Sequence, residues 1–243
     1  KQLADIDITQ EPMEVGPTTH YMMGGVKVDA DSQMSDVAGL FAAGECAAGL
    51  HGANRLGGNS LSDLLVFGKR AGEYAAAYAK ENSLGAVNMD ELGSAEKWAL
   101  RPFERKGPDN PYAVQHKLQD VMQEQVGIVR QEQEMLQALE RIRELKAASE
   151  RVSVDGNREY NAGWHTALDL HSLLTVSEIV TLAALERKES RGAHFRDDFP
   201  AKDKQYDGFN IVVRKGAGGE KQLTREQIPA LREDLQQIIQ EMK

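Results

Sequence analysis

The sequence predicts an α+β fold with three parts. Short strands followed by one helix come first, an antiparallel three-helix bundle follows, and a small α/β segment of strand and helix ends the chain. Three observations predict this order: residues 24–44 form short extended stretches, residues 111–200 carry long amphipathic stretches, and a new extended stretch follows Pro200. We expect the parts to cover residues 1–95, 111–200 and 201–243, with a linker at 96–110.

The first part combines a strand pattern with a helix pattern. Val26 and Val28 alternate with polar neighbours, and the apolar run 40–43 follows a turn-prone segment, so we expect a strand pair and one buried strand. Asn59 or Ser60 can then cap a helix that continues through an alanine-rich stretch to Lys80. Both side chains suit this place because they accept hydrogen bonds from the first N–H groups of a helix.

Glycine and proline residues interrupt the pattern between residues 81 and 111. Such breakers are typical of connections between organised regions, which places the linker here. They are Gly85, Gly93, Pro102, Gly107, Pro108 and Pro111.

Three stretches beyond the linker repeat apolar residues at helical spacing. Three antiparallel helices are the simplest way to bury such faces against one another. The apolar positions include Val114, Leu118, Val121 and Met122; then Leu136, Leu139, Ile142 and Leu145; and finally Leu168, Leu174, Ile179, Leu182 and Leu185.

The last part changes character again. Residues 209–213 form a strand pattern, residues 216–219 a flexible turn, and the remaining residues a final amphipathic helix. The sequence allows two starts for this helix. Thr224 and Gln227 could form a capping box, or Pro229 could mark a later first turn.

The composition argues against several classes of protein. The 243 residues include 38 acidic and 29 basic side chains, and the net charge of -9 argues against nucleic acid as a partner. No apolar stretch approaches the roughly 20 residues of a membrane span, so we expect a soluble protein. Cys46 is the only cysteine, which excludes an internal disulfide and a Cys-rich metal site and fits the cytoplasm. Because Lys1 stands where Met usually begins a protein, we expect a piece of a longer one.

Residues 51–61 gather side chains suited to an anionic ligand. Arg55 offers a planar fork of donors that matches a carboxylate at two points. The neighbouring glycines are costly in conformational entropy unless the backbone takes unusual dihedral angles or approaches a ligand closely. A structural ion pair is the alternative for Arg55.

His20 and His51 can each donate a hydrogen bond to a carboxylate. Neither belongs to a metal motif, because the spacing H-E-x-x-H and a cysteine pair are both missing, and no metal site is expected. A packed, hydrogen-bonded histidine is the alternative for each.

Glu45, Ser60 and Leu61 suit a flat cofactor. An acidic side chain at the carboxyl end of a strand can accept hydrogen bonds from ribose or ribityl hydroxyls. The helix that opens at Ser60 offers unpaired N–H groups and a partial positive charge, which would stabilise the negative charge of a reduced flavin. A surface carboxylate and an ordinary capped helix are the alternatives. No G-x-G-x-x-G occurs, so the chain lacks a pyrophosphate-binding start of its own.

Four motifs, in this order, make the chain resemble the carboxyl-terminal part of the flavoprotein subunit of succinate dehydrogenase and fumarate reductase. They are PTTHYMMGG at 17–25, GLFAAGE at 39–45, HGANRLGGNSLSDLLVFG at 51–68 and ESRGAHFRDDFP at 189–200. The resemblance implies that the first part is the carboxyl-terminal remnant of an FAD-binding α/β domain. The family's helical domain would then correspond to the predicted bundle.

The resemblance also implies roles for individual residues. The residues that match His20 and Arg55 hold the dicarboxylate in this family, and those that match Glu45, Ser60 and Leu61 contact FAD. His51 opens the loop that carries Arg55, and we expect it to bind substrate as well. We expect Tyr21, next to His20, at the cofactor.

Enzymes of this family interconvert succinate and fumarate in electron transport and the tricarboxylic acid cycle. A hydride moves between substrate and flavin, and electrons leave through an iron-sulfur subunit. The resemblance therefore implies FAD as cofactor, a dicarboxylate substrate, an iron-sulfur partner and, indirectly, membrane-anchor subunits. It places the protein at the cytoplasmic face of the cell membrane.

The family's dinucleotide fold and its proton-shuttling arginine match nothing in this chain and would precede Lys1. We therefore expect no catalytic residue here, and we expect the fragment alone to be inactive and to bind FAD weakly or not at all.

Two other functions stay open. L-aspartate oxidase has a similar loop, although Met22-Met23 and Gly57-Gly58 favour the succinate dehydrogenase group. The bundle and the last part could instead serve as an excised docking module for the iron-sulfur subunit. For the basic cluster formed by Arg191, His194 and Arg196, a structural role at the end of a helix is favoured over a binding site.

Overall fold

The computed structural model describes residues 5–16 and 20–242. It has the α+β fold that the sequence predicts, with helices joined by two small two-stranded sheets. Short 3-10 helices lie at Gly44–Cys46 and Lys204–Tyr206. The other elements are α1 (Asn59–Glu81), α2 (Met89–Glu104), α3 (Pro111–Gln125), β1 (Val129–Arg130), α4 (Glu132–Ser149), α5 (Ala162–Glu186), β2 (Phe195–Arg196), β3 (Phe209–Lys215), β4 (Lys221–Gln227) and α6 (Glu233–Glu241).

The region before α1 is held by single β-bridges, where the sequence predicts a strand pair and a buried strand. The described pairs are Val26 with Ala47, Val28 with Ser35, and Met34 with Phe41. Tight turns keep each pairing short: after Val28 the carboxylate of Asp29 accepts the N–H groups of Asp31 and Ser32, which bends the chain at once. The strand pattern therefore gives pairing without regular strands.

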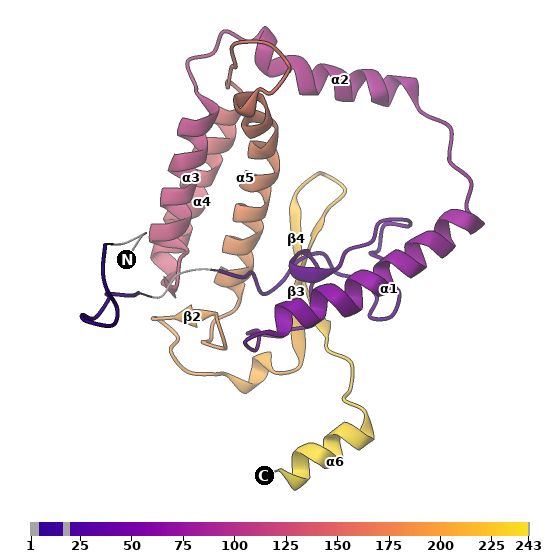
Figure 1. The fold of residues 1–243 in the computed structure, drawn as a ribbon, viewed down its shortest axis with the longest axis vertical. Coiled ribbons are helices and arrows are strands. Elements are labelled where there is room, and N and C mark those ends of the chain that lie inside the picture. The colour runs from indigo at the N-terminus through magenta and orange to yellow at the C-terminus, as the bar shows by residue number, and fades with distance from the viewer. Residues whose placement is uncertain (1–4, 17–19, 243) are drawn as a thin grey trace.

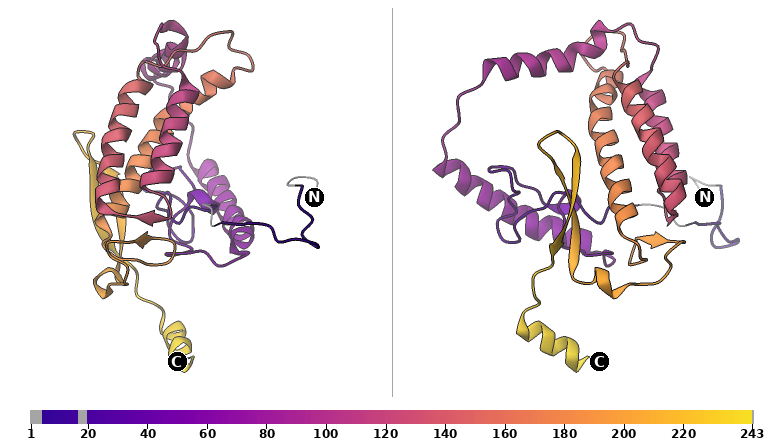
Figure 2. Two further views of the ribbon diagram at one scale, coloured as in Figure 1. Left: turned by 90° about the vertical axis from the view of Figure 1, so that its left-hand side faces the viewer. Right: turned by 180° about the vertical axis from the view of Figure 1, so that it is seen from behind.

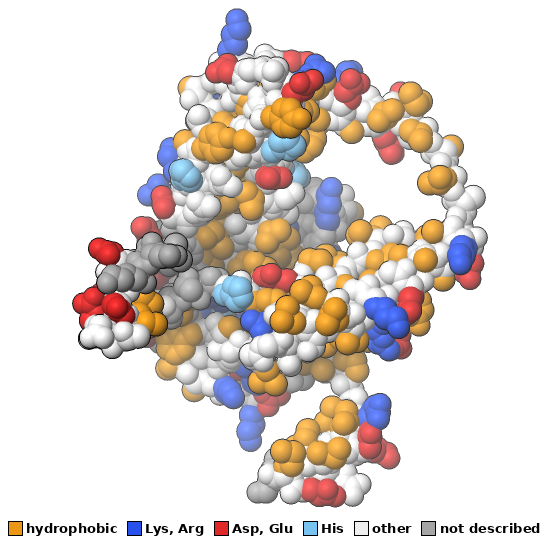
Figure 3. Space-filling model, viewed as in Figure 1, with side chains coloured by type: hydrophobic (Ala, Val, Ile, Leu, Met, Phe, Trp, Pro, Cys, Tyr) orange, Lys and Arg blue, Asp and Glu red, His pale blue; other side chains and the backbone are white. Residues whose placement is uncertain are grey.

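Helix α1 begins at Asn59, but its N-cap is Gly58 rather than Asn59 or Ser60. The φ of Gly58 is 83°, in the left-handed region that favours glycine, and no described side chain caps the helix. The expected side-chain cap is therefore wrong; in the first turn the N–H groups of Asn59 and Leu61 donate instead to the carbonyl oxygens of Leu56 and Gly58, at 3.1 Å each. Apolar side chains gather over α1 in Figure 3, and several are more than half exposed: Leu61, Leu64, Leu65 and Val66.

Helix α2 occupies most of the stretch that the sequence predicts as a linker, 96–110. The side chain of Asn88 caps it by accepting the N–H groups of Asp90 and Glu91 at 3.0 and 3.3 Å. At its other end, Trp164 of α5 donates to the carbonyl oxygen of Ala99 at 2.7 Å. A good cap and this tertiary contact thus outweigh the glycine and proline in the stretch. Figure 1 shows α2 leaving one end of the bundle.

Helices α3, α4 and α5 form the three-helix bundle that the sequence predicts, and Figure 2 shows them side by side from two further directions. Asn110 and Asn161 cap α3 and α5. Burial of each large apolar side chain in such a core contributes about 1.5–3 kcal/mol. The main core cluster contains Val114, Leu118, Ile142, Leu145, Val152, Leu170 and Leu174.

Helix α5 corrects one expectation. We expected no stretch apolar enough for a membrane span, but α5 has 25 residues and a window of mean hydropathy 1.4, and meets that test by length and composition. In the structure α5 packs against α3 and α4, and its Leu170 and Leu174 are buried in the core. Only 22% of that window is buried, so packing in the bundle explains its apolar composition in part.

The last part is a hairpin followed by a helix. Strands β3 and β4 pair antiparallel, while β1 and β2 form a separate parallel pair. The sequence predicts β3 but not β4, whose residues are mostly polar or charged. Thr224 and Gln227 lie in β4 opposite Val212 and Phe209, so the suggested capping box is wrong, and α6 begins only after Pro229.

Candidate functional site

The turn at residues 51–58 connects the first 3-10 helix to α1 and places the candidate side chains. Gly52 and Gly58 have φ values of 56° and 83°, which other residues rarely adopt. This turn brings His51 and Arg55 beside Tyr21, which lies just before the bridge at Val26. Three of the predicted site residues therefore meet where α1 begins.

Arg55 lies over the ring of Tyr21. Its guanidinium is 4.7 Å from the centroid of the ring, within the range of a cation-π contact. Its Nη1 donates to the carbonyl oxygen of Leu56 at 3.1 Å. Its Nε is buried and has no hydrogen-bond partner among the described residues, and no described carboxylate forms an ion pair with it. A buried donor without a partner is costly, which favours a site that an anion completes.

A compact hydrogen-bonded group contains Tyr21, His51 and Asp63. The Tyr21 hydroxyl donates to Asp63 Oδ2 at 3.2 Å, and His51 Nε2 lies 3.2 Å from the same oxygen and 3.3 Å from the Tyr21 hydroxyl. Because an ionised carboxylate only accepts, the proton belongs on His51 Nε2. The second ring nitrogen, Nδ1, has no hydrogen-bond partner among the described residues.

The Tyr21 hydroxyl is held in its protonated form. Burial raises the pKa of Tyr21, and the hydrogen bond with Asp63 and the negative charges of Asp63 and Glu45 raise it further. Tyr21 therefore remains a hydrogen-bond donor at neutral pH.

Sequence reasoning missed Asp63. An acidic residue in the first turns of a helix is favoured by the helix dipole and usually faces solvent, so its presence carries no separate signal. In the structure Asp63 is only 4% exposed. The sequence offers one clue to its burial: Asp63 lies between the apolar residues Leu61 and Leu64.

The predicted contact with the cofactor involves Glu45, Ser60 and Leu61. The backbone N–H of Met22 donates to Glu45 Oε1 at 2.9 Å, which ties the Tyr21 segment to the 3-10 helix. Ser60 and Leu61 belong to the uncapped first turn of α1. A Cβ added at Gly58 would meet nothing within 4 Å, so the backbone is open to a flat ligand. The partial positive charge at the start of α1, beside an exposed carboxylate, fits the charge pattern of FAD.

His20 is exposed, and residues 17–19 before it lie outside the described residues. Among residues 5–16 and 20–242, none forms a hydrogen bond with its ring. The pairing of His20 with Arg55 on one dicarboxylate therefore stays a prediction.

The basic cluster after α5 is an ion-pair network. Buried Glu189 accepts from Arg187 at 2.7 Å and from Arg191 at 2.8 and 2.9 Å. Buried Arg196 donates twice to Asp198, at 2.7 Å each. These partners support the structural role favoured for the cluster.

His194 belongs to the same network. Its Nδ1 accepts from Arg130 at 2.8 Å, and its Nε2 donates to the carbonyl oxygen of Arg187 at 3.0 Å. Both ring nitrogens are thus occupied within the protein.

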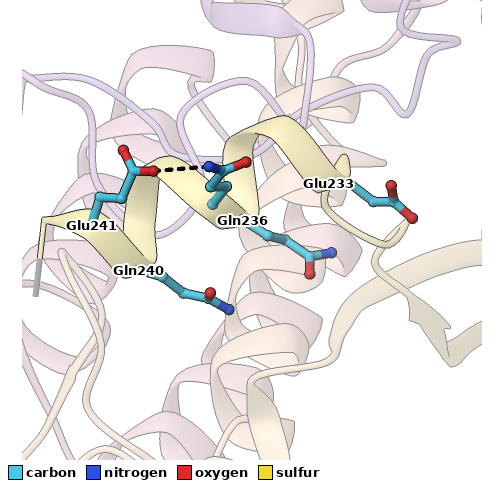
Figure 4. Close-up of a pocket in the computed structure, with 5 residues that line it drawn as sticks. Glu233, Gln236, Gln240 and Glu241 are labelled. Carbon is cyan, nitrogen blue, oxygen red and sulfur yellow. Dashed lines mark hydrogen bonds between the residues drawn. The ribbon is translucent and has the colours of Figure 1, made fainter.

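A shallow hollow elsewhere runs along α6 (Figure 4). Its lining comes from one helix, with Gln237 donating to Glu241 at 2.9 Å, and a single helix cannot enclose a ligand. The lining residues are Glu233, Gln236, Gln237, Gln240 and Glu241.

Two family models match the chain. One, described as fumarate reductase flavoprotein C-term, matches residues 115–238, and the other, described as FAD binding domain, matches residues 1–61. The second match ends at Leu61, so it covers the segment that carries Tyr21, Glu45, His51 and Arg55.

Three known proteins illustrate the similarity. The succinate dehydrogenase flavoprotein subunit of Coxiella burnetii is 38% identical over 215 residues, which cover 84% of this chain and 37% of that protein. The fumarate reductase flavoprotein subunit of Haemophilus influenzae is 39% identical over 204 residues, 82% of this chain and 34% of that protein. The structure of Mycobacterium smegmatis Sdh1 in complex with UQ1 has a TM-score of 0.90 at 46% identity, over 98% of this chain and 41% of that one. The chain thus spans well under half the length of each relative.

Proposed function

The chain belongs to the succinate dehydrogenase and fumarate reductase flavoprotein family, which binds FAD, and from this premise we propose its function. The whole protein interconverts succinate and fumarate, and this chain supplies the dicarboxylate-binding and flavin-contacting part. The observation that carries the proposal is Arg55. Its guanidinium lies over the Tyr21 ring, has no carboxylate partner among the described residues, and has a buried Nε without an acceptor there.

Arg55 binds one substrate carboxylate. A guanidinium donates two parallel hydrogen bonds to a carboxylate, and a carboxylate held at two points has a fixed orientation. The ring of Tyr21 limits rotation of the guanidinium, so the fork presents the same edge to each substrate. Orientation of this kind lowers the entropy that must be lost at the transition state.

His51 and His20 complete the dicarboxylate site. His51 Nε2 lies 3.2 Å from Asp63 Oδ2, and an imidazolium that donates from Nε2 to Asp63 would carry a second proton on Nδ1 for a substrate carboxylate. His20 lies one residue before Tyr21, at the exposed edge of the same segment. The two histidines assist Arg55 with the substrate carboxylates.

Glu45, Ser60, Leu61 and Tyr21 contact FAD. FAD, when bound, would supply hydride transfer to and from the substrate. The start of α1 would stabilise negative charge on the flavin, and the Glu45 carboxylate would accept hydrogen bonds from the hydroxyls of FAD.

The remaining parts of the whole protein complete the enzyme. Turnover needs a proton-transferring residue and a dinucleotide fold that the described residues do not supply, so this chain alone has no turnover. Electrons pass to an iron-sulfur subunit, and membrane-anchor subunits hold the assembly at the cytoplasmic face of the cell membrane.

The substitution Arg55→Lys in the whole protein tests the proposal. A point charge cannot reproduce the planar fork, so kcat/KM for succinate should fall by about a hundredfold or more while FAD content stays unchanged. Arg143→Lys is the matched control, because Arg143 is an exposed residue of α4 paired with Glu140. Near-normal succinate kinetics in Arg55→Lys would overturn the role of Arg55.

A further inference from the structure

We infer that Asp63 is a positioning residue for the dicarboxylate site, acting on Arg55 through the hydroxyl and ring of Tyr21. This inference rests on the proposed function and names a residue that the function has not used. It concerns a buried carboxylate that forms no ion pair with an arginine or lysine among the described residues.

The burial of Asp63 is the first step of the argument. A carboxylate that is 4% exposed loses most of its hydration and needs partners that replace it. Its Oδ2 has two, the Tyr21 hydroxyl and His51 Nε2, both at 3.2 Å. The charge of Asp63 is therefore matched by two groups of the site and not by a separate basic side chain.

The link from Asp63 to Arg55 is the second step. The hydroxyl bond fixes one end of the Tyr21 ring, and the ring packs edge-on against His51 with centroids 5.5 Å apart and planes at 80°. Arg55 lies on the face of that ring, 4.7 Å from its centroid. The guanidinium has one further described contact, a hydrogen bond from Nη1 to the carbonyl oxygen of Leu56. A shift of the Tyr21 ring would therefore change the orientation of the guanidinium.

A purely structural role for Asp63 gives different expectations. If the carboxylate only stabilised the start of α1, its loss would lower the melting temperature without changing how dicarboxylates bind. If it acted independently of Tyr21, its loss and the loss of the Tyr21 hydroxyl would add. Positioning through Tyr21 instead predicts weaker dicarboxylate binding and effects that do not add.

The experiment uses the whole FAD-loaded protein and malonate, a dicarboxylate that cannot be oxidised in the same way. The variants are Asp63→Asn, Tyr21→Phe and the double variant, with Glu73→Gln as control because Glu73 is an exposed acid of the same helix. The dissociation constant of malonate is measured from the change in flavin absorbance, together with KM and kcat for succinate, FAD content and melting temperature.

Each single variant should weaken malonate binding by about tenfold to a hundredfold, the range expected for one lost hydrogen bond to a charged group. The double variant should bind no more weakly than Asp63→Asn, and Glu73→Gln should match the wild type. Tyr21→Phe keeps the ring and Asp63, so it decides the question if Asp63→Asn does not fold.

Wild-type affinity in Tyr21→Phe or Asp63→Asn, or additive effects in the double variant, would overturn the inference while leaving the proposed function intact. A wild-type protein that neither binds malonate nor oxidises succinate would instead overturn the proposed function itself.

Discussion

The backbone N–H of Ala193 donates to the carbonyl oxygen of Ala53 at 2.9 Å and so joins the loop after α5 to the turn that carries Arg55. The two residues are far apart in the sequence. Ala193 lies in the loop that holds the ion-pair network, and Ala53 lies in the turn of the candidate dicarboxylate site. The loop after the bundle thereby holds the turn of the candidate site.

Gly192→Ala should disturb this support. Gly192 has a φ of 58°, and a Cβ there would lie 2.3 Å from the carbonyl oxygen of Ala53, so the turn must move. In the whole protein we expect KM for succinate to rise by about tenfold through displacement of Arg55, measured by steady-state kinetics. Gly93→Ala in α2 is the control, because a Cβ there meets nothing within 4 Å. Unchanged kinetics in Gly192→Ala would show that the contact does not position the turn.

His194 should make stability depend on pH. Burial lowers its pKa to about 4, and the charges of Arg130 and Arg196 lower it despite the hydrogen bond to Arg187. Because the unfolded chain binds this proton near the usual 6.5, the free energy of unfolding should fall as the pH drops from about 6.5 towards 4. Between pH 7 and pH 5 the expected loss from this group is about 1–2 kcal/mol.

Urea unfolding of this chain at several pH values checks the expectation. His194→Gln should show a shallower fall in stability than the wild type over this range. His116→Gln, on the exposed face of α3, should keep the wild-type slope. Equal slopes in all three proteins would contradict the assigned protonation state of His194.

Met135→Ala should show that α4 is a core helix. Met135 is fully buried, and its truncation should cost about 2–5 kcal/mol of unfolding free energy through lost burial and the remaining cavity. The adjacent Leu136 is 44% exposed, so Leu136→Ala should cost less than about 1 kcal/mol. Denaturant unfolding of both variants measures the difference, and similar losses would mean that α4 is rotated from its described orientation.

The bundle could be predicted from the sequence because its signal is local. Apolar residues repeat at helical spacing in each helix, and that spacing identifies the helices and much of the core, including Leu118, Ile142 and Leu174. Leu136, however, is 44% exposed, and the fully buried Leu170 was not among the predicted positions. Helix α2 could not be predicted in the same way, because its docking through Trp164 and Ala99 depends on a contact between distant segments. The bridges near Val26 likewise depend on partners that the local pattern does not identify.

The candidate site likewise contains residues that the sequence identifies and one that it does not. Arg55, His51 and Tyr21 were recognisable by residue type and motif, and the structure brings them together. Asp63 was not, since only the fold shows that its side chain turns away from solvent and towards Tyr21. A positioning role depends on contacts between distant residues, which residue type alone does not indicate.

The central claim is that Arg55 and its neighbours form the dicarboxylate site of a succinate and fumarate oxidoreductase. The most direct test is to add succinate, without oxygen, to the whole FAD-loaded protein and to follow the flavin absorbance. We predict that succinate bleaches the flavin, that fumarate restores it, and that L-aspartate has no effect. A flavin that a chemical reductant bleaches but succinate leaves oxidised would contradict the claim.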